Sequence, residues 1–504
     1  MTYTGAVEIA DRDETEPIEV APKDLKRQTA RGAVVATAAQ AGTFLLRTGS
    51  LMILARLLLK EDFGLVNMVT AFTGLLALVR DAGLSMAMVQ RVSITRAQTS
   101  TLFWLNLTVG GVLALLAVAM APVLAVFYGE PRLFWVTVAL GTIPIFHGAA
   151  GQHRAMLQRN MRFAMLATID IVSLVFSIAA GIGMAMAGYG YWALVAMTMT
   201  QPVMSIPGAW LATGWIPGMP QRRAGIRSMV VYGGAVTLNN LIAYLAYNVD
   251  KALIGRFWGA EALGIYGRVY QLINLPTENM NSTIGLVAFP AFSRVQNDPA
   301  RLRNYFLRGY SLFLALVVPI AIACALFSED IVLVFLGPKW REAATVFRLL
   351  TPTILAFAFT NPFAWLMLAS GRASRCLRIG MAMTPVLVLS YALGLPHGPQ
   401  GVALGFSVTM VLAVVPVLMW AKYGTAITMR DILGAARPAS ISIAIAVVAT
   451  LALRPMVDRV EPAFVRLVTE STGLFAVYLF TLLFVMKQKS VYVELLRNIG
   501  LRVA

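Results

Sequence analysis

The chain has 504 residues, of which 58% are hydrophobic and only 13% are charged. Soluble domains carry about 25% charged residues, so this composition excludes an ordinary soluble protein and predicts helices in a lipid bilayer. The formal net charge of +17 would suggest a nucleic-acid partner for a soluble protein, but basic cytoplasmic loops explain it here, and no nucleic acid is expected.

The chain is expected to begin with a disordered cytoplasmic tail at residues 1–30, which are polar and lack an apolar signal-peptide core. About fourteen apolar stretches of roughly 20 residues follow, each long enough to cross a ~30 Å hydrocarbon core. The expected spans are 33–58, 63–89, 101–127, 132–152, 164–187, 189–212, 228–256, 262–292, 305–327, 342–369, 376–395, 398–421, 437–456 and 466–486.

Lys and Arg concentrate in every second loop between these spans. Because cytoplasmic loops favour Lys and Arg, the alternation predicts a multi-pass membrane protein with both termini in the cytoplasm. It also supports the number of spans, since one missed helix would disturb the alternation.

The sequence contains an internal repeat. The run LARLLLKEDFGL at 54–65 aligns with IGRFWGAEALGI at 254–265, and the two copies share an Arg, a Glu and a Gly at equal spacing. An even number of spans separates the copies, so the repeats run parallel, as in transporters whose two halves enclose a site near the midplane. The expected organisation is an N-terminal six-helix lobe at 31–215, a C-terminal six-helix lobe at 216–425, two further helices at 426–487 and a cytoplasmic tail at 488–504.

Three stretches carry a family resemblance: residues 54–65, residues 81–91 (DAGLSMAMVQR) and residues 248–256 (NVDKALIGR), the last continuing through 263–268 and 289–294. Together they resemble bacterial polysaccharide-transporter flippases of the lipopolysaccharide and exopolysaccharide type, in the multidrug/oligosaccharidyl-lipid/polysaccharide exporter superfamily. The resemblance implies an all-α membrane fold of two pseudo-symmetric six-helix lobes plus two C-terminal helices.

The resemblance also implies a function. A flippase of this kind moves undecaprenyl-diphosphate-linked oligosaccharide from the cytoplasmic to the periplasmic leaflet of the bacterial inner membrane. Its implied partners are the lipid-linked oligosaccharide, membrane lipids, and polysaccharide polymerase and chain-length proteins. No cofactor is expected, because the chain contains no Gly-rich phosphate loop with Lys and Ser or Thr.

Charged residues inside apolar spans are costly, so they are candidates for binding the cargo. In the first span, polar residues recur at spacings that place them on one helix face, namely Gln40, Thr43, Arg47 and Ser50. Arg47 lies near mid-membrane and is a candidate for the cargo diphosphate, because a guanidinium binds phosphate oxygens bidentately. The alternative is a structural pair with an acid such as Asp170 or Glu278.

Arg80 and Asp81 adjoin each other in the second span. Neighbours in a helix point about 100° apart, so the two side chains need different partners. We expect Arg80 to face the cavity and Asp81 to act as a structural cap.

The span at 262–292 is the most polar of the chain and is expected to line a cavity. Its candidate cargo residues share one face, namely Arg268, Gln271 and Glu278. Asp250 and Lys251, of opposite charge and adjacent, precede the second copy of the repeat. They are expected to form a gate or brace, with pairing between helices as the alternative.

Three other functions remain open. A lipid II flippase is close in kind, but the three stretches fit it less well. A multidrug extruder would need an acidic cavity, whereas basic residues outnumber acidic ones within these spans. A membrane polysaccharide polymerase usually has a large periplasmic loop, which the expected spans leave no room for.

Overall fold

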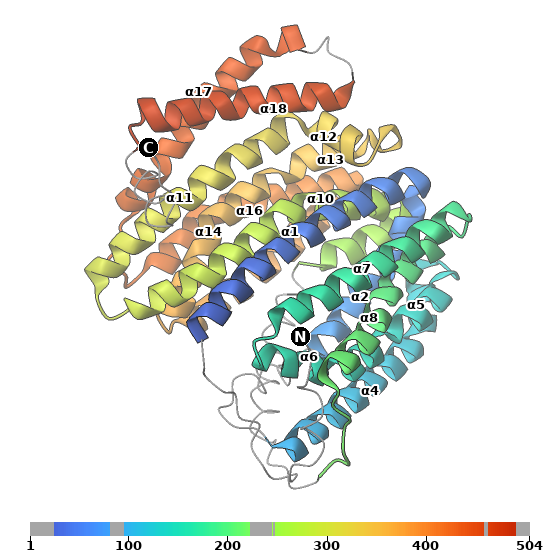
Figure 1. Cartoon of the computed structure of the whole chain (residues 1–504). Helices are drawn as coiled ribbons and strands as arrows, with labels where there is room; N and C mark the ends of the chain where they lie inside the picture. The colour runs from blue at the N-terminus through green and yellow to red at the C-terminus, as the bar shows by residue number, and fades with distance from the viewer. Residues whose placement is uncertain (1–24, 81–94, 222–243, 245–246, 458–461, 490–504) are drawn as a thin grey trace, which may run out of the picture. The chain divides into compact units, whose positions relative to one another are not determined.

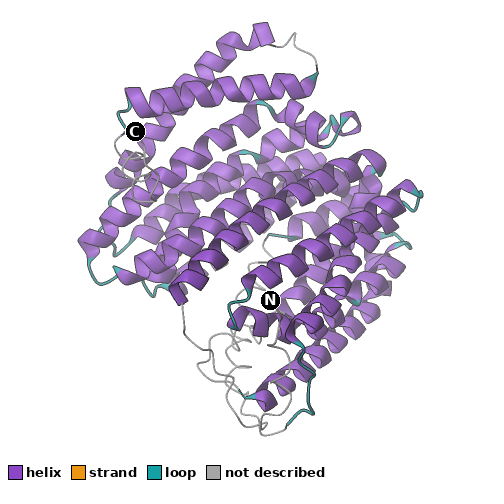
Figure 2. Cartoon of the chain, viewed as in Figure 1, coloured by secondary structure: helices purple, strands orange, loops and turns teal. Residues whose placement is uncertain are grey.

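The structure, a computed structural model, describes residues 25–80, 95–221, 244, 247–457 and 462–489. Within these ranges the regular elements are helices, with no strand (Figure 2). Nine segments in the same ranges are long and apolar enough to cross a membrane. One of them, Ala373–Lys422, contains two successive helices. The predicted all-α membrane fold is confirmed, whereas the number of fourteen spans stays a prediction.

The helices form two compact units, Met1–Gly264 and Ile265–Ala504. The predicted boundaries of the two six-helix lobes and of the two further helices stay predictions. The first unit contains α1 (Leu25–Leu57), α2 (Lys60–Arg80), α4 (Arg96–Tyr128), α5 (Leu133–Gly141), α6 (Ile143–Arg159), α7 (Phe163–Met186), α8 (Tyr191–Thr213) and the start of α10 (Val249–Arg294) (Figure 1).

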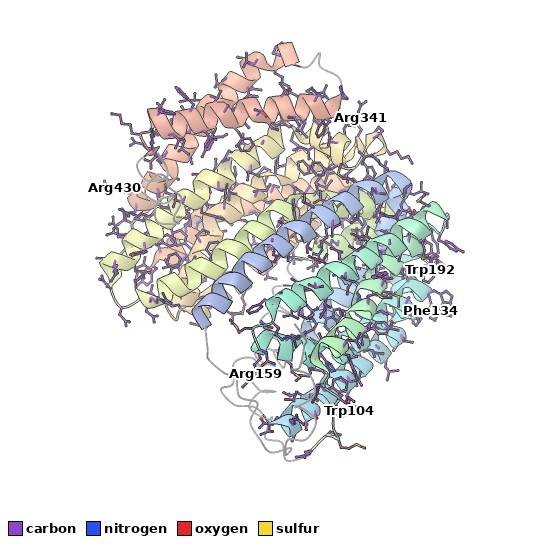
Figure 3. The ribbon with its side chains drawn as sticks, in the orientation of Figure 1. Trp104, Phe134, Arg159, Trp192, Arg341 and Arg430 are labelled. Carbon is purple, nitrogen blue, oxygen red and sulfur yellow. The ribbon has the colours of Figure 1, made fainter. Side chains whose placement is uncertain are left out.

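Neighbouring helices of the first unit pack as α7 on α8, α4 on α6 and α1 on α7. The start of α4 is fixed by a capping box, in which the Thr95 side chain accepts from the amide of Gln98 and the Gln98 side chain accepts from that of Thr95. Aromatic side chains lie at both ends of this unit, with Phe134 and Trp192 at one end and Trp104 at the other (Figure 3). Such placement is typical of membrane–water interfaces.

The second unit contains the rest of α10, then α11 (Pro299–Leu326), α12 (Ser328–Phe335), η1 (Pro338–Trp340), α13 (Ala343–Leu350), α14 (Pro352–Ala369), α15 (Ala373–Gly394), η2 (Leu395–His397), α16 (Gly398–Lys422), α17 (Met429–Val457), α18 (Ala463–Phe480) and η3 (Thr481–Val485). Here α15 packs on α16, α14 on α16, and α11 on α17.

Inside the part of α10 that belongs to the first unit, Gly259 has a positive φ of 79° and breaks the helix between two predicted spans.

Both units contain the same helical corner. It joins α6 to α7 in the first unit and α14 to α15 in the second, and its central residue is left-handed in each, Met161 at φ 55° and Gly371 at φ 69°. The next residue is an Arg in both corners. Arg162 donates to the carbonyl of Ala212 over 2.9 Å, and Arg372 donates to that of Tyr423 over 3.2 Å. Each Arg thereby satisfies carbonyls that the end of a helix leaves open.

The two copies of the repeated run contact each other inside the first unit. A Cβ built on Gly64 would lie 1.7 Å from the carbonyl oxygen of Ala260, and one on Gly264 would lie 1.9 Å from that of Lys60. The contact is reciprocal, because Lys60 and Ala260 occupy matching places in the two copies. Only a glycine permits such close backbone approach, which explains the glycine at this place in both copies.

Candidate functional site

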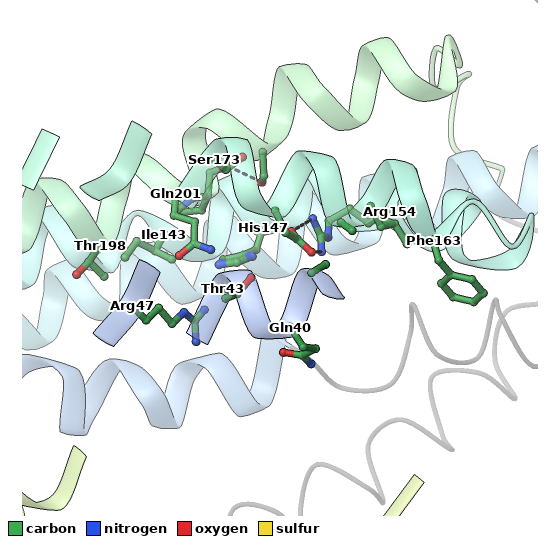
Figure 4. A pocket seen from close by; sticks show the side chains of 16 residues that line it. Gln40, Thr43, Arg47, Ile143, His147, Arg154, Phe163, Ser173, Thr198 and Gln201 are labelled. Atoms are coloured by element: carbon green, nitrogen blue, oxygen red, sulfur yellow. Dashed lines mark hydrogen bonds and ion pairs between the residues drawn. The ribbon is translucent and has the colours of Figure 1, made fainter. Parts of the chain in front are cut away.

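A pocket of about 780 Å³ opens between α1, α6, α7 and α8 of the first unit (Figure 4). Of these helices, α6 and α7 belong to segments apolar enough to cross a membrane, yet all four present polar side chains to the pocket. These side chains include Gln40, Thr43, Arg47, His147, Arg154, Asp170 and Gln201.

The α1 wall of the pocket carries Gln40, Thr43 and Arg47. Their spacing, together with that of Ser50, predicted one shared helix face. The face is confirmed for these three residues, which line the same pocket, whereas Ser50 is buried and is not among the lining residues. The Arg47 side chain is exposed, and within the described residues its guanidinium has no hydrogen bond or ion pair. It is therefore available to an anion that enters the pocket.

The opposite wall carries an ion pair between α6 and α7. Arg154 Nη1 donates to Asp170 Oδ1 over 2.7 Å, and Nη2 donates to Oδ2 over 3.0 Å. Both side chains are partly exposed, Arg154 by 33% and Asp170 by 45%. Among the Lys, Arg, Asp and Glu residues that line this pocket, two arginines outnumber one aspartate.

Sequence reasoning missed this pair. The expected spans 132–152 and 164–187 leave Arg154 in the loop between them, whereas Arg154 lies inside α6. Asp170 pairs with Arg154 and not with Arg47. One signal was available: Arg154 follows His147 by seven residues, which places both on one helix face. Figure 4 shows His147 beside Arg154, and Arg47 across the pocket on α1.

The candidates of the second unit lie on α10. Arg268 Nη1 donates to Gln271 Oε1 over 2.6 Å, so the predicted shared face of these two residues is confirmed. Glu278 lies in α10 as well, but its side chain is outside the described residues. A role in cargo binding stays a prediction for all three.

The remaining candidates lie in the first unit. Arg80 is the half-buried last residue of α2, and its neighbour Asp81 lies outside the described residues. Asp250 is almost fully buried, and its carboxylate accepts from the backbone amide of Lys251 over 2.8 Å. The Lys251 ammonium donates to Asn248 Oδ1 over 2.7 Å. These contacts lie at the start of α10, and a gate or brace stays a prediction.

An ion-pair cluster lies beside the reciprocal glycine contact of the first unit. Lys60 Nζ lies 3.5 Å from Glu261 Oε1, and Arg132 binds both Glu61 and Glu130. The hydrogen bond to Glu61 is the main cause that raises the pKa of Arg132 above its ordinary value, and the bond to Glu130 adds to it. These pairs join the α1–α2 turn to the α4–α5 turn and to α10.

The second unit has a smaller pocket of about 210 Å³, lined by Arg303 and Arg372 among others. Both arginines are engaged. Arg303 Nε donates to Asp431 over 2.9 Å, and Arg372 donates to the end of α16. Within the described ranges, no group of three or more His, Cys, Asp or Glu residues could hold a metal ion.

The comparisons with known proteins point to one family. The profile of a family described as polysaccharide biosynthesis protein matches residues 53–345, more than half of the chain. Teichuronic acid biosynthesis protein TuaB of Bacillus subtilis (strain 168) is 30% identical over 301 residues, covering 59% of this chain and 62% of that protein. The chain thus spans less than two thirds of that relative. Lipopolysaccharide biosynthesis protein WzxC of Escherichia coli (strain K12) is 24% identical over 369 residues, covering 71% of this chain and 74% of that protein.

Among solved structures, the lipid II flippase MurJ in an inward closed conformation superposes with a TM-score of 0.73. The superposition covers 91% of this chain and 100% of that one, at 13% sequence identity. An inward-facing multidrug resistance transporter of the MATE family superposes with a TM-score of 0.59 at 14% identity, covering 77% of this chain and 97% of that one. At such identities the likeness shows a shared fold.

Proposed function

The chain belongs to the polysaccharide biosynthesis protein family, and from this premise we propose that it is a flippase and not an enzyme. It moves undecaprenyl-diphosphate-linked oligosaccharide repeat units from the cytoplasmic to the periplasmic leaflet for lipopolysaccharide or exopolysaccharide biosynthesis. The observation that carries the proposal is the pocket of the first unit, where Arg47 and Arg154 line one cavity together with polar side chains. Charged residues at membrane depth are rare and mark substrate pathways.

The chemistry of the pocket suits the head of such a cargo. A diphosphate offers several charged oxygens, and a planar guanidinium binds two of them at once with short, strong hydrogen bonds. Gln40, Thr43 and Gln201 supply amide and hydroxyl groups for sugar hydroxyls on the surrounding walls. The lipid tail stays among the apolar helices.

Transport then proceeds by alternating access, in which two halves of the protein open first to one side and then to the other. The reciprocal contact of Gly64 and Gly264, with the Lys60–Glu261 pair beside it, supports a closed outer side. Opening requires these contacts to separate, and closing re-forms them without new chemistry. Asp250 and Lys251 act as a gate or brace, and Arg268, Gln271, Glu278 and Arg80 are further cargo-binding residues.

The protein works in the inner membrane with both termini in the cytoplasm, where its cargo is assembled. Polysaccharide polymerase and chain-length proteins are its partners on the periplasmic side. The names of the relatives support this setting, since they are biosynthesis proteins for teichuronic acid and lipopolysaccharide. A multidrug extruder fits less well, because a pocket with a net positive charge repels cationic drugs.

Flipping is tested directly in proteoliposomes. The full chain is reconstituted with a fluorescent, short-chain polyprenyl-diphosphate oligosaccharide, and a membrane-impermeant quencher reports which leaflet holds the probe. We expect wild-type protein to equilibrate the probe and Arg47→Ala to stop this. Arg341→Ala is the matched control, since Arg341 is 73% exposed beside Glu329 in the second unit (Figure 3). Equal rates in empty liposomes and in liposomes with wild-type protein would contradict the proposal.

A further inference from the structure

We propose that Arg154 is a second phosphate-binding residue that Asp170 holds in reserve and that the cargo diphosphate releases by displacing the carboxylate. This inference rests on the proposed function, because the displacing group is the diphosphate of the cargo. It assigns the α6–α7 pair a role in both capturing and releasing that cargo.

The Arg154–Asp170 pair is bidentate. Arg154 presents two N–H groups to two carboxylate oxygens at 2.7 and 3.0 Å. This fork is also the arrangement in which a guanidinium binds phosphate. A phosphate can therefore take the place of the carboxylate without changing the geometry of the donors.

The Arg154–Asp170 pair is accessible from the pocket. Arg154 and Asp170 are 33% and 45% exposed, and both line the pocket that Arg47 enters from α1. An anion attracted by Arg47 thus meets the pair inside the same cavity. Without cargo, Asp170 keeps Arg154 from being left as an isolated charge at membrane depth, which would be costly.

The larger negative charge of the diphosphate favours its exchange for the Asp170 carboxylate when cargo is present. The Asp170 carboxylate carries one negative charge and neutralises one guanidinium, whereas a diphosphate carries more and can neutralise Arg47 and Arg154 together. No covalent bond changes; one ion pair is replaced by another. When the cargo moves on, Asp170 binds Arg154 again, which opposes rebinding and favours release.

A purely structural brace between α6 and α7 is the competing account, and the second unit speaks against it. The corner joining α14 to α15 repeats the α6–α7 corner at an offset of 210 residues. The first helix ends at residue 159 in one corner and at 369 in the other, and the second helix begins at 163 and at 373. In that register, Arg154 corresponds to Ala364 and Asp170 to Gly380. The same helical corner therefore forms without an ion pair, so the fold does not require one.

The test is a double-mutant cycle on ligand binding by the purified full chain in lipid nanodiscs. The probe is farnesyl diphosphate. In parallel measurements, inorganic diphosphate reports the binding of a free anion, and farnesol reports the binding of the apolar tail. We expect Asp170→Asn to lower the Kd for farnesyl diphosphate by about tenfold, because it removes the competing charge. Arg154→Gln should raise the Kd by about tenfold or more.

The decisive variant combines Arg154→Gln with Asp170→Asn. We expect it to bind like Arg154→Gln alone, because the gain from removing Asp170 requires a free Arg154. Asp431→Asn is the matched control, since it breaks another bidentate Arg–Asp pair, with Arg303 of the second unit, and should leave the Kd unchanged.

The outcomes separate this inference from the proposed function. Tighter binding of inorganic diphosphate and farnesyl diphosphate alike by Asp170→Asn, with no change for farnesol, supports the exchange. Unchanged or weaker binding by Asp170→Asn overturns it, even if Arg47→Ala still abolishes flipping. If wild type and Asp170→Asn both fail to bind every diphosphate probe, the exchange and the diphosphate pocket are both wrong.

Discussion

The helices α6 and α7 of the first unit and α14 and α15 of the second share a backbone design but differ in chemistry. Both pairs turn through a left-handed residue followed by an Arg that binds the end of a third helix. Only the first carries an ion pair that faces a pocket, at places where the second carries Ala364 and Gly380. Backbone and turn chemistry are therefore repeated, whereas the charged groups are specific to one unit.

This difference teaches where to look for function in a duplicated membrane fold. Contacts that occur in both copies, such as the Arg162 and Arg372 contacts, are explained by the needs of helix ends. A charged contact that occurs in one copy needs another explanation, because burying it is costly and the other copy folds without it.

The largest effect is expected at Arg47. Arg47→Ala should lower polysaccharide export by about 100-fold at equal protein level, since losing a charged partner of a bound anion costs about 2–5 kcal/mol. Arg47→Lys should keep partial export, because the charge remains while the bidentate geometry is lost. The measurement is surface polymer per cell against membrane abundance, and full export by Arg47→Ala would place the cargo outside this pocket.

Arg268 and Arg80 extend the comparison beyond the pocket. We expect Arg→Ala at either position to lower export, by less than at Arg47, and Arg→Lys to retain more export than Arg→Ala, because the charge remains. The measurement is again surface polymer per cell against membrane abundance. Wild-type export by both alanine variants would confine cargo binding to the pocket of the first unit.

Making the first unit resemble the second should affect function more than folding. We expect Arg154→Ala combined with Asp170→Ala to lower export by about tenfold, because one phosphate ligand is lost. Membrane abundance and the thermal midpoint should stay close to wild type, since α14 and α15 form the same corner without the pair. A large drop in abundance, with export per molecule unchanged, would instead identify the pair as a brace.

The glycine contact of the repeated run should respond to a single methyl group. Gly264→Ala places a Cβ 1.9 Å from the Lys60 carbonyl oxygen, so the helices must separate at a cost of about 1–3 kcal/mol. We expect less cross-linking between Lys60→Cys and Glu261→Cys after Cys324 and Cys376 are replaced. Gly434→Ala is the control, because nothing lies within 4 Å of its built Cβ.

The smallest effect is expected at the two corners. Met161 holds a positive φ that L-residues avoid, so Met161→Gly should stabilise the protein by about 0.5–1 kcal/mol. Gly371→Met should destabilise it by a similar amount. Thermal unfolding followed by tryptophan fluorescence measures both changes, and shifts of equal sign would show that the two corners are not equivalent.

The sequence predicted much of the fold and one wall of the site, for physical reasons. Apolar length predicted an all-α membrane protein, and helical spacing predicted the shared face of Gln40, Thr43 and Arg47, which line one pocket. Breaks inside spans were harder to predict: the expected span 132–152 contains the end of α5 and the start of α6 at Thr142. The signal for this break is Pro144 in the first turn of α6, which is easily overlooked because the run stays apolar across it.

The α6–α7 wall was not predicted, because a basic residue near the end of an apolar span can lie either in a loop or in a pocket. Loop Arg residues and pocket Arg residues look alike in a sequence, and counting by loops placed Arg154 outside the membrane. Asp170 needs a partner from another helix, and sequence spacing holds no information on pairs between helices. Only the packing of α6 against α7 revealed that its partner is Arg154.

The central claim is that the pocket of the first unit holds the diphosphate of the cargo. A structure of the full chain with farnesyl diphosphate bound in nanodiscs tests it most directly. We predict phosphate density within hydrogen-bonding distance of Arg47 and Arg154, with the Asp170 carboxylate moved away from Arg154. Phosphate density at Arg268 of the second unit, with the Arg154–Asp170 pair intact and the pocket empty, would contradict the claim.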